Sequence, residues 1–143
     1  MCTCSSSPQA NGQFQPVLRI APGEAVRLRL VHAGVNDHFN ITLGGCMLLT
    51  LARDGVYLPS PRRQPSVLMG PGSRADLAVQ CKGPGMFHLA SSGGGDMAYL
   101  GTRTNLFEGT LAFISVDGSA LDMDLPKELP GPLNMGRLLQ DLR

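Results

Sequence analysis

Alternation of apolar and polar residues is the dominant pattern along the chain. In segments 26–30, 39–43 and 75–81, apolar side chains occupy every second position. Because successive side chains of a strand point to opposite faces, these segments are predicted to be strands with one face in a core and one in water. Residues 46–52 are almost continuously apolar, which is typical of a central strand covered on both faces.

Glycine and proline separate these segments. The 143 residues include 18 Gly and 11 Pro, which suits short strands joined by many turns better than a helical bundle. The pattern predicts an all-β protein of about eight strands, in an antiparallel sandwich or barrel. Residues 82–85 are predicted to form a hairpin loop that returns 86–90 beside 75–81. Three prolines in 59–65 predict a segment without regular structure.

The length predicts a single domain. Its body is expected to span 11–122, after a flexible tail at 1–10 and before a Pro- and Leu-rich linker or docking tail at 123–143. Within the body, the Gly-rich segment 91–105 is expected to be an exposed excursion. Residues 133–142 are compatible with one or two helical turns.

Charge and hydrophobicity exclude several classes of protein. Twelve basic residues nearly balance 11 acidic ones, whereas a nucleic-acid binder that acts through electrostatics needs a basic surplus. A hydrophobic content of 43% excludes a disordered chain. No apolar run reaches the roughly 18 residues that predict a membrane span. Residues 1–10 lack the features of a signal peptide, and the cellular compartment stays open.

Four cysteines and three histidines limit the metal chemistry that the chain can support. The cysteines, at positions 2, 4, 46 and 81, lack CxxC spacing and therefore indicate neither a zinc site nor a disulfide framework. A single blue-type copper uses two His, one Cys and a weakly bound Met. The nearest candidate set is Cys81, Met86 and His88, with a more distant His32 or His38.

Several short blocks, in this order and spacing, resemble the second, plastocyanin-like domain of multicopper oxidases such as laccases. The resemblance covers residues 11–117 and implies a cupredoxin-like Greek-key β-sandwich. The blocks that carry it are Asn11-Gly12-Gln13, Pro22-Gly23-Glu24, Arg27-Leu28-Arg29-Leu30-Val31, Asp54-Gly55 and Pro71-Gly72-Ser73-Arg74-Ala75-Asp76.

The chain also departs from this family. His32 stands where the family usually has Asn, Cys46 where many members have His, and Ser73 where Glu is usual. Neither a His-Cys-His segment nor a pair of His-x-His motifs is present, and these are how the family builds its mononuclear and trinuclear copper centres. The resemblance places those ligands in the first and third domains, so this chain is similar to the copper-free domain between them. Three histidines cannot supply a complete oxidase site.

The resemblance also bears on the candidate copper ligands. The order here is Cys-Met-His, whereas blue-copper domains of this fold have Cys-His-Met on one loop. Cys81 continues an apolar strand face, as a buried structural thiol would. We therefore expect no catalytic, cofactor or metal residues, with His32 and His88 in structural roles and His38 as a hydrogen-bonded turn residue.

The predicted function is structural. As the middle domain of a multicopper-oxidase-type protein, or as its reduced descendant, the chain would space and orient copper-bearing cupredoxin neighbours. The whole protein would be an oxidoreductase that couples oxidation of a phenol or metal ion to reduction of dioxygen. Two alternatives stay open: a small copper electron-transfer module, and a protein-binding sandwich that uses Arg62 and Arg63 or segment 91–105. Arg27 and Arg29 either anchor a neighbouring domain or acidic turn, or are solvated charges.

Overall fold

The computed structural model describes residues 7–35, 37–92 and 105–130, which contain twelve short strands. Eight of them (β3, β4, β5, β6, β7, β9, β10 and β12) have four or more residues, in agreement with the predicted number. In chain order the strands are β1 (Gln9–Ala10), β2 (Gln13–Phe14), β3 (Val17–Ile20), β4 (Ala25–Val31), β5 (Asp37–Leu43), β6 (Met47–Arg53), β7 (Val56–Arg63), β8 (Val67–Met69), β9 (Arg74–Gln80), β10 (Gly85–Ser91), β11 (Asn105–Leu106) and β12 (Gly109–Val116).

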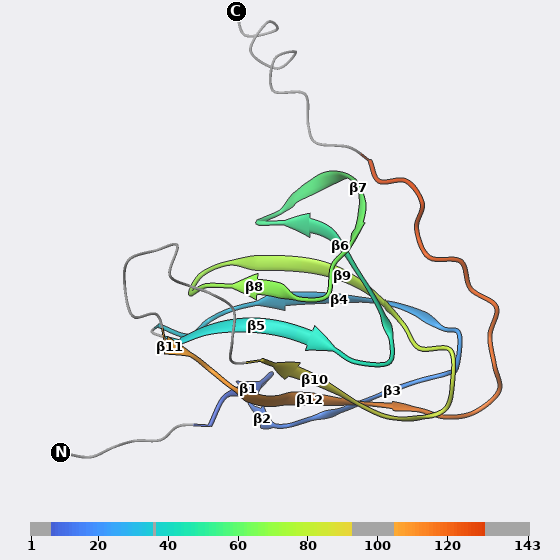
Figure 1. Ribbon diagram of the computed structural model, residues 1–143, viewed down its shortest axis with the longest axis horizontal. Coiled ribbons are helices and arrows are strands. Elements are labelled where there is room, and N and C mark those ends of the chain that lie inside the picture. The colour runs from blue at the N-terminus through green and yellow to red at the C-terminus, as the bar shows by residue number, and fades with distance from the viewer. Residues whose placement is uncertain (1–6, 36, 93–104, 131–143) are drawn as a thin grey trace, which may run out of the picture.

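Two main sheets pack face to face, which confirms the predicted β-sandwich (Figure 1). One sheet has the order β11-β5-β10-β12-β3, with β8 paired to β5 as its sixth strand. The other has the order β4-β9-β6-β7. Neighbouring strands are antiparallel except for the pairs β3–β12 and β5–β11, which are parallel. β1 and β2 form a separate hairpin.

The core lies between the two sheets and follows the alternation seen in the sequence. On β9, Ala75, Leu77 and Val79 are buried, and β12 contributes Ile114 and Val116 in the same way. Burial of these apolar side chains is the main favourable contribution to folding. Strand β6 is buried along most of its length, as predicted for residues 46–52.

The prediction that 59–65 lacks regular structure was wrong for most of this segment, because β7 extends through Pro59 and Pro61. Proline removes a ladder donor and is therefore tolerated on edge strands and at irregularities. β7 is one of the two edge strands of its sheet. Its pairing with β6 covers residues 56–57 and 62–63 and is interrupted between them, where both prolines lie. Neither proline therefore removes a donor that this ladder uses.

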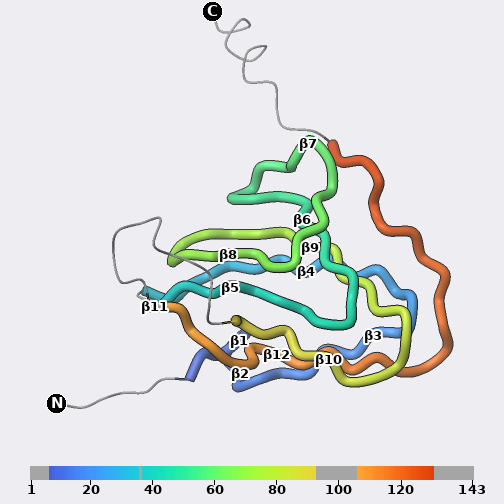
Figure 2. The backbone as a smooth tube through the Cα atoms, viewed as in Figure 1, coloured from blue at the N-terminus to red at the C-terminus, as the bar shows by residue number. Residues whose placement is uncertain are grey.

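The prediction of a hairpin at 82–85 was also wrong. β9 pairs with β4 and β6, whereas β10 pairs with β12 and β5 of the other sheet. The link therefore crosses from one sheet to the other, as do the links 21–24 and 44–46 (Figure 2). Alternation shows that a segment is a strand, but it does not show which strand is its neighbour.

After β12, residues 117–130 continue without a helix or strand past the end of the sandwich where these crossings lie (Figure 1). The Leu121 N–H donates to the Pro22 carbonyl oxygen at 2.7 Å, and Gln80 Nε2 donates to the Met123 carbonyl oxygen at 2.6 Å. Most of the expected excursion at 91–105 and the expected helical turns at 133–142 lie outside the described residues. Within the described part, no helix is long and apolar enough to cross a membrane.

Candidate functional site

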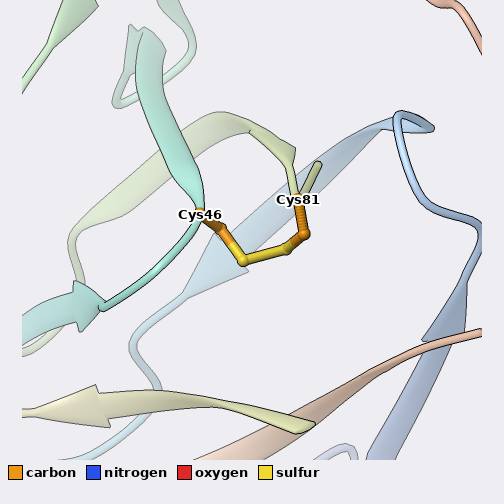
Figure 3. The surroundings of a disulfide bond; sticks show 2 residues. All are labelled: Cys46 and Cys81. Atoms are coloured by element: carbon orange, nitrogen blue, oxygen red, sulfur yellow. A yellow bond between two sulfur atoms is a disulfide. The ribbon is translucent and has the colours of Figure 1, made fainter. Parts of the chain in front are cut away.

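Cys81 forms a disulfide bond with Cys46 (Figure 3). The two Cα atoms are 4.4 Å apart, although the residues are separated by 35 positions in the sequence. Met47 on β6 pairs with Gln80 on β9, so the two cysteines lie next to each other just beyond this pair. The sequence analysis missed the disulfide because the pairing depends on β6 and β9 being neighbours. Cys81 is fully buried, as expected, but it is not a free thiol.

Met86 and His88 lie on β10, in the other sheet, and both are exposed. His88 Nδ1 is 3.2 Å from Thr110 Oγ1, and its ring lies edge-on to Phe113 at a centroid distance of 4.9 Å. The structure thus places Met86 and His88 on one exposed face, and it does not bring the buried Cys81 sulfur to that face. A blue-type copper needs a thiolate ligand, which a disulfide sulfur is not. While this disulfide is formed, the three candidate residues do not fit copper.

His32 has a structural role, as the sequence analysis predicted. Its ring is buried just beyond β4 and stacks on Phe39 with centroids 4.3 Å apart. The Gly34 N–H donates to Nδ1 at 3.0 Å, and Nε2 lies 2.7 Å from the Asp37 carbonyl oxygen. Because Nδ1 accepts a hydrogen bond, the proton is on Nε2, which donates to Asp37. Both ring nitrogens are therefore engaged by the backbone.

His38 differs from its expected role as a hydrogen-bonded turn residue. It lies within β5, where it pairs with Leu106 of β11 and its carbonyl oxygen accepts a hydrogen bond from the Phe107 N–H at 3.0 Å. Its Nδ1 is buried and has no hydrogen-bond partner in the described structure. The alternating segment 39–43 is thus longer than predicted, and β11 recruits His38 into a parallel pair that sequence periodicity does not reveal.

Arg62 and Arg63 were predicted to lie in a loop, and the structure instead places them at the end of β7. They pair with Thr50 and Leu49 of β6. Arg63 also lines an open hollow of about 380 Å³, together with Cys46 and the aliphatic side chains of Leu43 and Leu48.

A cluster of charged side chains lies on the outer face of the four-stranded sheet. Arg27 of β4 donates a hydrogen bond to the Asp76 carboxylate of β9, and Arg29 Nε lies 3.7 Å from the same carboxylate. The Arg27 guanidinium also lies over the Tyr57 ring of β7, 5.6 Å from its centroid. Hydrogen bonding to Asp76, and then to Tyr57, raises the pKa of Arg27. Beside this cluster is an open groove of about 470 Å³.

Comparison with known proteins assigns both the fold and the family of this β-sandwich: it matches the cupredoxin domains of multicopper oxidases. The profile of the family described as Multicopper oxidase matches residues 3–118, which is most of the chain. The chain therefore belongs to the multicopper oxidase family. No curated protein matches the sequence.

Several solved structures of bacterial multicopper oxidases are similar to this chain. A laccase-like multi-copper oxidase, CueO, from Ochrobactrum sp. is 25% identical over 85% of the chain, with a TM-score of 0.68. A multi-copper oxidase from Pseudomonas Thermotolerans is 26% identical over 87% of the chain, with a TM-score of 0.65. A Campylobacter jejuni metallo-oxidase, at 24% identity over 85% of the chain and a TM-score of 0.64, shares the fold. The chain spans only 26%, 27% and 25% of these three structures.

Proposed function

We propose that this chain is a copper-free structural domain of a multicopper-oxidase-type assembly. It would space and orient copper-bearing cupredoxin domains that belong to the same polypeptide or to a separate subunit. The observation that carries this proposal is the coverage: the chain corresponds to about a quarter of each similar oxidase. In this proposal, the other three quarters of the oxidase architecture, with the copper ligands, come from the neighbouring domains.

Two of the residues that could donate to a metal, His32 and Cys81, support the same function. The sequence contains three histidines. Both ring nitrogens of His32 are hydrogen-bonded to backbone groups, and the sulfur of Cys81 is bonded to that of Cys46. If His32 bound a metal, it would have to give up these hydrogen bonds and leave buried backbone groups unpaired. Cys81 would first need its disulfide bond to be reduced.

The assembly as a whole would oxidise a phenol or a metal ion and reduce dioxygen. The similar Ochrobactrum protein is described as having oxidase activity towards lignin model compounds, and the Campylobacter protein as a metallo-oxidase. In such an assembly this chain would form one wall beside the copper centres and would carry no electron itself.

The test pairs this chain with a companion polypeptide that carries His-Cys-His and His-x-His copper motifs and is encoded beside it. The two are produced separately and together, loaded with copper, and assayed for dioxygen uptake with a phenol or with Cu⁺. We expect no uptake by this chain alone and clear uptake by the pair. Uptake by the purified chain alone would overturn the structural role, as would the absence of copper-motif domains encoded beside this chain or in the same polypeptide.

The alternative function as a small copper module is favoured by one observation, the position of Met86 and His88 on one exposed face. Its test adds copper to the chain with and without prior reduction of the disulfide. An intense visible thiolate-to-copper band that disappears in Cys81→Ala would support the copper module and contradict the copper-free role. We expect no such band.

A further inference from the structure

The groove on the four-stranded sheet follows one row of residues across all of its strands. Arg29 of β4 pairs with Asp76 of β9, Asp76 pairs with Ala52 of β6, and Ala52 pairs with Tyr57 of β7. Ala52 is only 3% exposed although it lies on the outer side of the sheet. A small side chain between longer neighbours forms a floor, so the hollow is a product of the register rather than of a flexible loop.

The sides of the groove come from adjacent rows. Arg27, stacked on Tyr57, lines one side. Val31 and Arg74, which pair with each other on β4 and β9, line the other side. Val31 is 68% exposed, so an aliphatic side chain stands free beside the guanidinium groups.

Among the described residues, the arginines of this groove have more donors than nearby protein acceptors. Each guanidinium has five N–H donors. Arg29 reaches Asp76 only at 3.7 Å, and Arg74 uses Nη2 for a single bond to the Asp54 carbonyl oxygen at 3.0 Å. The Asp54 carboxylate accepts instead from the backbone N–H of Arg74 at 2.8 Å. Within the described residues, most donors of Arg29 and Arg74 therefore face solvent and are available to a partner, and the positive charge and planar fork of a guanidinium match a carboxylate.

We propose that this arginine groove (Arg27, Arg29, Val31, Ala52, Tyr57, Arg74 and Asp76) is the contact surface for an acidic segment of a companion cupredoxin domain. The proposal rests on the proposed function and names the surface through which the domain holds its neighbour. One or two carboxylates of the partner would pair with Arg29 and Arg74, while an aliphatic side chain would cover Val31.

The groove fits a protein segment better than a small anion. The Arg29 side chain is 78% exposed, whereas a built small-molecule site encloses its polar groups. Arginine and tyrosine around a small apolar patch are enriched at protein interfaces. The Arg27–Asp76–Tyr57 contacts already hold one guanidinium in place, which lowers the entropy cost of forming the interface.

The first experiment needs no companion and uses an oligoglutamate peptide as the probe. Titration into the isotope-labelled chain is followed by amide chemical shifts. We expect shifts concentrated in β4, β9 and β7, and their loss in the double variant Arg29→Ala/Arg74→Ala. The matched control is Arg19→Ala, because the Arg19 side chain is also 78% exposed and also lies near one carboxylate, Asp117, at 3.8 Å. Shifts that spread equally over Arg19, or that persist in the double variant, would overturn the proposal.

The second experiment measures binding of the copper-bearing companion polypeptide to the unchanged chain and to the same variants. We expect the double variant to lose about tenfold or more in affinity, and Arg19→Ala to stay within about twofold, with less difference between them at high salt. A thermal unfolding scan confirms that the variants are folded. If the companion binds every variant equally and the pair oxidises its substrate, the proposal that the groove is the contact surface is wrong, and the proposed structural function stands. If the companion does not bind the unchanged chain, both are wrong.

Discussion

Gly23 is the residue at which the link between β3 and β4 meets the C-terminal segment. Its N–H donates to the Cys81 carbonyl oxygen at 2.8 Å, and its own carbonyl oxygen accepts from Gln80 Nε2 at 2.8 Å. It has a positive φ of 77°, and a Cβ on this residue would overlap the carbonyl oxygen of Leu121. Glycine is required here for two separate reasons, the backbone conformation and the close approach of another segment.

Replacement of Gly23 by alanine is therefore expected to cost more than backbone strain alone. Gly23→Ala should lower the free energy of unfolding by about 2–4 kcal/mol, from left-handed strain together with displacement of the C-terminal segment. The measurement is urea unfolding at equilibrium. Gly72→Ala is the matched control, because Gly72 has a φ of 80° and no atom near the position of its Cβ. It should cost about 1 kcal/mol, and equal losses in the two variants would show that the contact with Leu121 contributes nothing.

Sequence analysis identified the Pro22-Gly23 turn but not the contact that makes Gly23 indispensable. A Pro-Gly pair is a local signal, since its effect on φ does not depend on the rest of the chain. Leu121 is far from Gly23 in the sequence, and no local pattern around Gly23 predicts that the two residues meet. The two histidines differ in the same way. The structural role of His32 was predicted and involves nearby residues, whereas the strand position of His38 depends on pairing with the distant β11.

The elements show how far the alternation of residues determines the structure. β4 and β9 were predicted within one or two residues, because a half-buried strand has a period of two wherever it lies. The hairpin between β9 and β10 was wrong because the partner of a strand is chosen by the packing of the whole sandwich. The disulfide was missed for the same reason, because it depends on the order β4-β9-β6-β7. The sequence analysis named Arg27 and Arg29 as possible anchors of a neighbouring domain, but the groove around them depends on the same strand order.

Strand β7 closes one edge of the four-stranded sheet and carries two prolines where its ladder to β6 is interrupted. An edge strand with a regular row of free N–H groups is a template for pairing with another molecule. Pro59 and Pro61 have no N–H group to offer to another strand, and they lie where the ladder of β7 is irregular. We infer that they protect this edge from association.

The double variant Pro59→Thr/Pro61→Thr tests this protection. Two N–H groups return to the edge, and threonine favours extended strands, so the variant should form dimers or larger species at concentrations where the unchanged chain does not. Light scattering coupled to size-exclusion chromatography is the measurement. Pro65→Thr serves as the control because Pro65 follows β7 and lies outside its ladder. If all three chains elute alike, the prolines have no protective role.

At the scale of the whole molecule, the covalent and hydrogen-bonded cross-links and the proposed contact surface lie in different parts of the sandwich. Three of the links that cross between the sheets, 21–24, 44–46 and 81–84, lie at one end, and the disulfide and the C-terminal segment both join that end (Figures 1 and 2). The disulfide and the hydrogen bonds of the C-terminal segment thus tie that end together. The outer face of the four-stranded sheet carries the arginine groove. The proposed contact surface instead lies on regular strands that hold its side chains in fixed register.

The disulfide should contribute much of the stability of this small domain. Cys46 and Cys81 are 35 residues apart, and closing a loop of this length in the unfolded chain is worth about 4 kcal/mol in the chain-entropy description. Cys46→Ala/Cys81→Ala should therefore lower the free energy of unfolding by about 2–4 kcal/mol. Because only the unchanged chain has this bond to lose, a reductant should shift its urea midpoint toward that of the variant and leave the variant where it is. If the reductant shifts the urea midpoints of the unchanged chain and of the variant equally, its effect does not come from the Cys46–Cys81 bond. A variant as stable as the unchanged chain would mean that the crossings are held by packing and by Gln80 and Gly23 alone.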